Sequence, residues 1–162
     1  MSGVYTVAFL GHRYIDAPYR VEKMLEKYIR KFICENEYVK FLVGCSGDFD
    51  RCASSSVVRV QKSYRDDNNS LVLILPYLTA DYLRNQNSFE EYYGCIEISR
   101  SAAKVHPKES ILARNREMVD RADLIICYIE RESGGAYQAV KYALKHGKRI
   151  INLANDFATL AP

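Results

Sequence analysis

Short apolar runs that alternate with amphipathic stretches are the feature of this sequence that most constrains its fold. The runs span residues 4–10, 38–43, 71–75, 124–129 and 150–153. Continuous runs of this length are typical of strands covered on both faces, and the stretches between them, where apolar residues recur every three or four positions, predict amphipathic helices. These helices are expected at residues 20–34, 50–64, 110–121 and 133–144. The pattern predicts an α/β fold with three layers, in which helices cover both faces of a mainly parallel five-stranded sheet.

Length and composition point to one folded unit. The chain has 162 residues, of which 48% are hydrophobic and 27% are charged, so we expect a single domain over residues 1–162 rather than disorder. No apolar run approaches the roughly 20 residues that span a bilayer, and the first residues lack the features of a signal peptide. We therefore expect a cytoplasmic protein without a membrane partner.

Charge and cysteine spacing argue against two further classes of site. The 23 Lys and Arg residues are interspersed with 20 Asp and Glu residues, so the sequence does not support a nucleic-acid partner. The five cysteines and three histidines are scattered and contain no C-x-x-C pair, so no metal site is expected. The phosphate-loop and dinucleotide fingerprints are absent as well, and we expect no bound cofactor.

Small and polar residues follow the predicted strands at the edge where parallel strands end. An arginine there can bind a phosphate with its forked guanidinium, and glycines before a helix leave free N–H groups for an anion. Asp48 or Asp50 can accept a hydrogen bond from a ribose or cap the next helix. Because ligands of such sheets bind at this edge, we expect a phosphate-containing ligand. The candidate residues are Gly11, His12, Arg13, Gly44, Ser46, Gly47, Asp48, Ser133, Gly134, Gly135 and Ala136.

The order of these motifs resembles the SLOG superfamily, and is most similar to its small bacterial DUF1273/YpsA-like branch. The resemblance rests on the R-N-R-E-M-V run at residues 114–119, on Ala122-Asp123 and on Gly134-Gly135-Ala136. It covers the chain apart from residues 78–110. It implies a Rossmann-like fold that binds nucleotides or nucleotide-derived molecules. Better understood relatives include cytokinin-activating phosphoribohydrolases, a DNA-processing protein and sensor domains of antiphage systems.

The resemblance also implies roles for particular residues. It places Arg114, with Asn115 beside it, on the side of a helix that faces the ligand, and it assigns Gly134 and Gly135 to the phosphate. The hydrolase relatives carry P-G-G-x-G-T-x-x-E, whereas residues 133–140 here lack the Gly-Thr pair and the glutamate. A glycosidic cleavage needs such a carboxylate. No catalytic residue is therefore assigned, and whether the chain is an enzyme stays open.

Three hypotheses for the function follow. The first is a domain that binds or senses a nucleotide-derived small molecule. The second is a nucleoside-phosphate-processing enzyme of the N-glycosidic hydrolase or transferase type, with Asp48 or a glutamate near the glycines as its acid or base. The third is a protein-interaction module that uses the tyrosine-rich residues 77–93.

Residues 78–110 have no sustained period, although residues 81–83 and 89–93 could form short helices and residues 95–98 a short strand. A long segment of this kind inside a small domain is typical of a lid or binding loop. Its tyrosines are of the kind that is enriched at interfaces. We therefore expect a homodimer in which this segment contributes to the subunit contact or forms a lid beside Gly47 and Gly134. The alternative is that the tyrosines cover the edge strand of a monomer.

Overall fold

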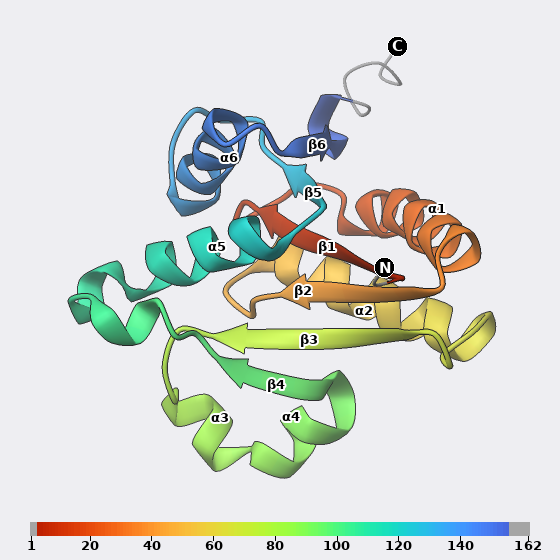
Figure 1. Cartoon of the computed structure of the whole chain (residues 1–162), viewed down its shortest axis with the longest axis horizontal. Helices are drawn as coiled ribbons and strands as arrows, with labels where there is room; N and C mark the ends of the chain where they lie inside the picture. Colours follow the sequence, from red (N-terminus) through yellow and green to blue (C-terminus); the bar gives the residue numbers. More distant parts are fainter. Residues whose placement is uncertain (1–2, 156–162) are drawn as a thin grey trace.

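The computed structural model describes residues 3–155, which form one parallel six-stranded sheet with the strand order β4-β3-β2-β1-β5-β6 (Figure 1). The predicted α/β fold is confirmed. The expected single domain over residues 1–162 includes residues 1–2 and 156–162, which lie outside this description. The strands are β1 (Val4–Gly11), β2 (Tyr38–Val43), β3 (Asn69–Leu75), β4 (Gly94–Ile98), β5 (Leu124–Tyr128) and β6 (Arg149–Asn152).

The prediction of five strands was one short, because β4 lies at the edge of the sheet. It pairs in parallel with β3, and its residues are exposed or only half-buried. A strand in this position does not need the continuous apolar run that marks a strand covered on both faces. β4 is therefore less apparent in the sequence than the other strands.

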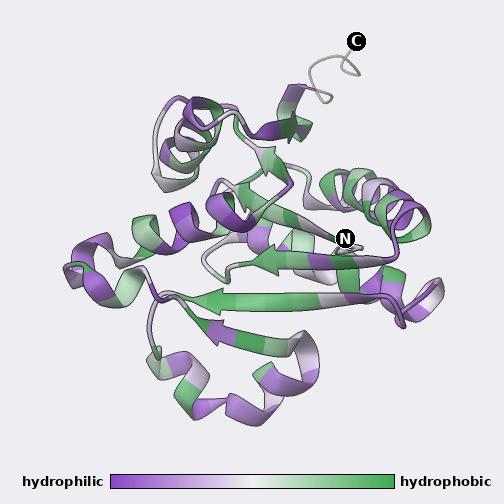
Figure 2. Cartoon of the chain, viewed as in Figure 1, coloured by the Kyte–Doolittle hydropathy of each residue, from purple (hydrophilic) through white to green (hydrophobic). Residues whose placement is uncertain are grey.

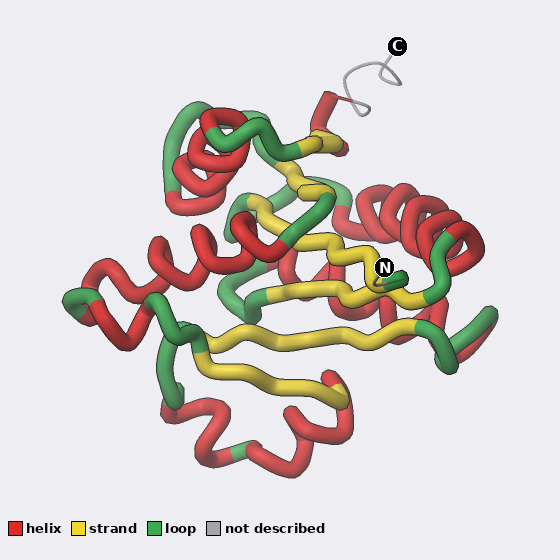
Figure 3. Tube along the Cα trace, viewed as in Figure 1, coloured by secondary structure: helices red, strands yellow, loops and turns green. Residues whose placement is uncertain are grey.

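Four long helices cover the two faces of the sheet (Figure 3). α1 (Pro18–Glu35) and α2 (Asp48–Ser63) pack on one face, and α5 (Ser110–Arg121) and α6 (Gly135–Lys145) pack on the other. Of the helices between residues 3 and 155, none combines the length and hydropathy that a bilayer-spanning segment needs. The helical periodicity therefore predicted the outer layers correctly.

The apolar runs are continuous because alternate residues of a strand face different helix layers. In β1, Val7 and Phe9 belong to the core beneath α1 and α2, whereas Ala8 and Leu10 belong to the core beneath α5 and α6. Figure 2 shows largely hydrophobic strands beside helices in which hydrophilic and hydrophobic residues alternate. Burial on both faces requires apolar side chains at successive positions, and this is why the strands could be recognised.

The segment at residues 78–110 forms short elements, including helices and a strand at the places where the sequence allowed them. It contains α3 (Ala80–Arg84), α4 (Gln86–Tyr93), β4 and two short 3-10 helices. Tyr82 packs with Leu73 and Leu75 of β3, and Tyr93 packs against the same cluster. These tyrosines therefore cover the sheet of their own chain near its β4 edge.

Neither Asp50 nor Ser110 caps a helix with its side chain. α2 begins at Asp48 with Gly47 as its N-cap, so Asp50 lies in the first turn instead of capping it. α5 is preceded by a 3-10 helix, and the hydroxyl of Ser110 donates to the carbonyl oxygen of Pro107 at 2.7 Å. Asp50 Oδ2 instead accepts the backbone N–H of Ser46.

Candidate functional site

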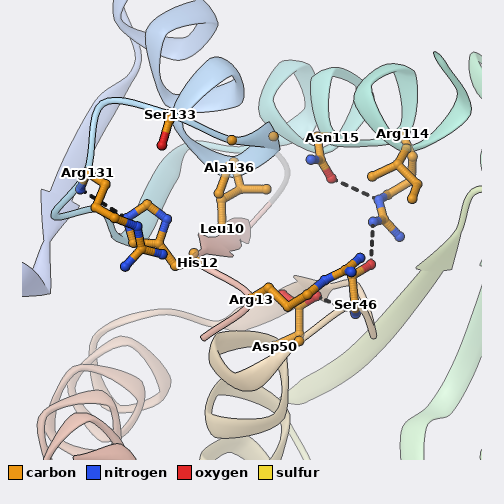
Figure 4. Close-up of a pocket in the computed structure, with 15 residues that line it drawn as sticks. Leu10, His12, Arg13, Ser46, Asp50, Arg114, Asn115, Arg131, Ser133 and Ala136 are labelled. Atoms are coloured by element: carbon orange, nitrogen blue, oxygen red, sulfur yellow. Dashed lines mark hydrogen bonds between the residues drawn. The ribbon is translucent and has the colours of Figure 1, made fainter. Parts of the chain in front are cut away.

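A cavity of about 360 Å³ opens at the carboxyl edge of the sheet, beside β1. β2, β3 and β4 extend the sheet on one side of β1, whereas β5 and β6 extend it on the other. The strand order reverses at this point, so the loops diverge and leave a crevice. The cavity is lined by Leu10, Gly11, His12, Arg13, Ser46, Gly47, Asp50, Ile111, Arg114, Asn115, Arg131, Ser133, Gly134, Gly135 and Ala136 (Figure 4).

All the candidate residues from the sequence line this cavity, except Gly44 and Asp48. Gly44 lies behind the lining, where a Cβ would be 3.1 Å from the Arg114 Cζ and from an Asp50 oxygen. Asp48 pairs with Arg51, and its Oδ2 accepts a hydrogen bond from the Ile15 N–H at 3.1 Å. Asp48 thus holds the loop after β1 in place, and its expected position beside a ligand is not what the structure shows.

The sequence analysis did not identify every residue that lines the cavity, and it expected a lid that does not lie there. Leu10, Ile111 and Arg131 line the cavity without having been singled out. Arg131 had a signal that could have been used, since it is a cation between β5 and the glycines that precede α6. No residue of the segment at 78–110 lines the cavity, so the expected lid beside Gly47 and Gly134 is absent from it.

Glycine is required at these positions of the cavity for two different structural reasons. A Cβ on Gly11 would lie 2.3 Å from the ring of Phe49, and one on Gly47 would lie 2.5 Å from the Cα of Arg13. These two glycines allow parts of the protein to pack closely. Gly134 has φ of +94° and no atom within 4 Å of an added Cβ, so the backbone conformation, rather than space, favours glycine there.

Arg114 is buried beneath the cavity and is only 2% exposed. Its Nε donates to Asn115 Oδ1 at 2.9 Å, its Nη1 to the carbonyl oxygen of Ile74 at 2.8 Å, and its Nη2 to Ser46 Oγ at 3.2 Å. Burial lowers the pKa of the guanidinium, and the nearby Asp50 carboxylate acts in the opposite direction. The side chain therefore connects α5, the end of β3 and the loop after β2.

Asp50 anchors the loop after β2. Its Oδ2 accepts a hydrogen bond from the Ser46 backbone N–H at 2.8 Å. Burial raises the pKa of Asp50, while the Ser46 N–H and the charge of Arg114 act to lower it. Asp50 is the only carboxylate among the cavity-lining residues, and it lies close enough to Arg114 to balance the buried charge of that guanidinium.

His12 connects the end of β1 to the loop after β5. Its side chain is 4% exposed, and its Nε2 accepts from the backbone N–H groups of Glu130 at 3.0 Å and Arg131 at 3.2 Å. An acceptor Nε2 requires the neutral ring with its proton on Nδ1. Burial lowers the pKa of His12, and the charge of Arg131 lowers it further, so the neutral form is favoured.

The remaining groups give the cavity a positive character. α6 begins at Gly135 with no side-chain cap and no acidic residue in its first turn, so its first N–H groups are free of such partners. Among the residues described, no carboxylate forms an ion pair with Arg13, and Arg131 pairs only with its neighbour Glu130 at 3.5 Å. Within residues 3–155 no cluster of His, Cys, Asp or Glu suits a metal ion. The arrangement can bind an anion.

No protein-family model matches this sequence, and no curated protein matches it. Solved structures of DNA processing protein A share the fold. For the Streptococcus pneumoniae protein the TM-score is 0.64 at 16% identity, covering 91% of this chain and 49% of that one. For the Helicobacter pylori protein the TM-score is 0.63 at 17% identity, covering 90% of this chain and 63% of that one. The chain thus spans half to just under two thirds of these proteins.

The Helicobacter pylori structure concerns the single-stranded DNA binding mode of that protein. The expectation that a nucleic-acid partner is unsupported is therefore wrong, since it rested on overall charge, whereas Arg13 and Arg131 line one cavity. At this level of identity the likeness is one of fold alone. The chain has the Rossmann-like fold that its resemblance to the SLOG superfamily implied, in the form that DNA processing protein A also has.

Proposed function

We propose that this cavity binds the phosphate of a nucleotide-derived small molecule. One observation carries the proposal: the uncapped start of α6 and the guanidinium groups of Arg13 and Arg131 belong to the same cavity. The start of a helix carries a partial positive charge and unpaired N–H groups, and arginine forks match phosphate oxygens. Three donors of this kind around one space favour a phosphate over a neutral ligand.

The size of the cavity favours a single nucleotide. Its volume of about 360 Å³ lies at the lower end of the range of about 300–1,000 Å³ that is usual for small-molecule sites. The lining also includes Leu10 and Ile111, which offer apolar contact beside the polar groups. A phosphate with its attached sugar matches this combination.

Single-stranded DNA is the second candidate, because the Helicobacter pylori protein, which has a similar fold, binds it. A strand offers the same phosphate chemistry as a mononucleotide. It differs because it brings several phosphates to the protein at once, and only one nucleotide fits the cavity. The two candidates can therefore be separated by how binding depends on salt.

The test is isothermal titration calorimetry with adenosine 5′-monophosphate and with a short oligodeoxythymidine. We expect binding by the native chain and its loss in Gly135→Asp, because a carboxylate at the start of α6 repels the phosphate. Leu144→Asp is the matched control, since it adds the same charge at an exposed position near the other end of α6. Failure of the native chain to bind either ligand, or unchanged binding in Gly135→Asp, would contradict the proposal.

Salt titration then distinguishes the two ligands. For a single strand, the logarithm of the binding constant falls with the logarithm of salt by about 0.7 per phosphate contacted. A slope that corresponds to one phosphate for both ligands supports a mononucleotide site. A much steeper slope for the oligonucleotide, with no competition from the mononucleotide, supports a strand that binds outside the cavity and contradicts the small-molecule proposal.

A further inference from the structure

Arg114 differs from the other two arginines of the cavity, because its guanidinium is already engaged. Nε, Nη1 and Nη2 each donate to a different partner, and the residue is 2% exposed. Arginine has only donors and no acceptor, so every atom that faces it within hydrogen-bond distance must be an acceptor. This fixes the orientation of the polar groups around it.

Asn115 is the first group whose orientation follows. Because its Oδ1 faces Arg114 Nε at 2.9 Å, its amide nitrogen lies on the opposite side, as Figure 4 shows. Asn115 lines the cavity, and among the described residues the hydrogen bond of its side chain is the one that Oδ1 accepts from Arg114. The amide therefore offers its two N–H groups to whatever occupies the cavity.

Ser46 is oriented in the same way. Its Oγ accepts from Arg114 Nη2 at 3.2 Å, so the hydrogen of the hydroxyl must point elsewhere. Its backbone N–H is taken by Asp50 Oδ2, which prevents rotation of this part of the loop. No described residue accepts from the Ser46 hydroxyl, and Ser46 lines the cavity. Ser46 is thus a second donor toward the ligand.

We propose that Arg114 is a positioning residue that fixes Ser46 and Asn115 as hydrogen-bond donors, so that the cavity accepts a group whose oxygens are all acceptors. The proposal rests on the proposed function and names the ligand chemistry more closely: a fully deprotonated phosphate or sulfate ester, in preference to a sugar hydroxyl or a protonated phosphate. The resemblance to the SLOG superfamily assigned Arg114 to the ligand side of its helix, whereas here it acts through its neighbours.

A lysine cannot replace Arg114 in this role. The guanidinium presents its donors in a fixed planar fork, which reaches Asn115, Ile74 and Ser46 at once. An ammonium presents three donors from a single point at the end of a flexible stem. Arg114→Lys therefore keeps the charge that balances Asp50 but releases the orientation of the two donors.

The decisive test compares Asn115→Asp with Asn115→Ala, because both variants leave Arg114 in place. The probes are inorganic sulfate and adenosine 5′-monophosphate, titrated into ¹⁵N-labelled protein while the amide signals of residues 133–136 are followed. Asn115→Ala removes the donor and also the oxygen that accepts from Arg114 Nε, whereas Asn115→Asp keeps that acceptor and replaces the donor with a charged acceptor. We expect affinity to fall in Asn115→Ala and to fall at least about tenfold further in Asn115→Asp, a difference of about 1.4 kcal/mol.

A second measurement asks whether Arg114 acts through Asn115. If it does, Arg114→Lys and Asn115→Ala are non-additive in binding, so the double variant binds about as weakly as Arg114→Lys alone. A purely structural role would change the melting temperature without producing this coupling. Full additivity, or equal affinities for Asn115→Asp and Asn115→Ala, would overturn the positioning role. Absence of binding by the native chain would instead overturn the proposed function.

Discussion

The backbone of Arg13 lies directly against Gly47. A Cβ on Gly47 would stand 2.5 Å from the Arg13 Cα, and the carbonyl oxygen of Arg13 accepts the Asp48 N–H at 2.8 Å. The loop after β1 and the start of α2 are therefore one packed unit. The position of the Arg13 guanidinium in the cavity depends on a glycine from a different loop.

The first prediction concerns this contact. Gly47→Ala forces the Arg13 backbone to move, because the atom closest to the new Cβ is the Arg13 Cα and not the end of a flexible side chain. We therefore expect a loss of about 1–3 kcal/mol in the free energy of unfolding. Nucleotide binding should weaken as well. Urea denaturation measures the first effect. Gly135→Ala is the control, because its Cβ would meet only Leu112 at 3.9 Å, and it should change stability by less than about 1 kcal/mol.

The second prediction concerns Gly11 and Phe49. Gly11→Ala places a Cβ within 2.3 Å of the fully buried Phe49 ring, so we expect destabilisation by about 1–3 kcal/mol. Phe49→Leu replaces that ring with a smaller aliphatic side chain and should be destabilising by itself. The two changes together should be less harmful than their sum, by about 0.5 kcal/mol or more, in a double-mutant cycle. Strict additivity would show that the two residues do not compete for the same space.

The third prediction is a pH dependence that comes from His12. Burial holds the pKa of His12 below its usual value in the folded state, so the unfolded chain takes up a proton at a higher pH than the folded chain. The contribution of His12 to stability is therefore complete above about pH 6.5, the usual value, and is lost as the pH falls toward the lower folded pKa. Melting temperatures between pH 8 and 5.5 check this.

His12→Gln provides the control for the pH experiment. A glutamine oxygen can accept from the Glu130 and Arg131 N–H groups but does not titrate in this range. We expect the native chain to lose more stability than His12→Gln as the pH falls from 7.5 to 5.5. Parallel curves for the two proteins would mean that His12 is not the group responsible.

The fourth prediction concerns the thiols. Burial raises the pKa of Cys52 to about 11 and that of Cys127 to about 12, whereas Cys34 and Cys95 are exposed. Because the thiolate is the nucleophile, iodoacetamide at pH 8 should label Cys34 and Cys95 well before the two buried thiols. Peptide mass spectrometry reads out the sites, and labelling in guanidinium chloride is the control. Early labelling of Cys127 in the native chain would be inconsistent with the core described here.

The secondary structure of the two helix layers and the central strands could be predicted because the information is local. A strand between two layers must be apolar at successive positions, as Ala8 and Phe9 show, and a helix on one face must repeat every three or four residues. β4 and the tyrosine-rich helices lacked such a signal, because they lie at an edge where burial is partial. Their apolar contacts are made with Leu73 and Leu75 of β3, outside their own elements.

The members of the cavity could mostly be predicted too, since parallel strands deliver their carboxyl ends to one edge. What each member does there could not. Gly11 and Gly47 line the cavity as the sequence predicted, but it did not indicate that they also accommodate Phe49 and the Arg13 backbone. Asp48 was expected at the ligand and instead binds Ile15 and Arg51.

The sequence by itself determined the layer architecture and the edge of the sheet at which polar side chains gather, because both follow from the spacing of residues along the chain. Only the tertiary structure decided which cations remain available to a ligand. Arg114 has no more polar neighbours in the sequence than Arg13, yet folding brings Ile74 and Ser46 to its guanidinium and buries it. Hydrogen-bond partners and burial depend on residues that are far apart in the chain, and no local pattern encodes them.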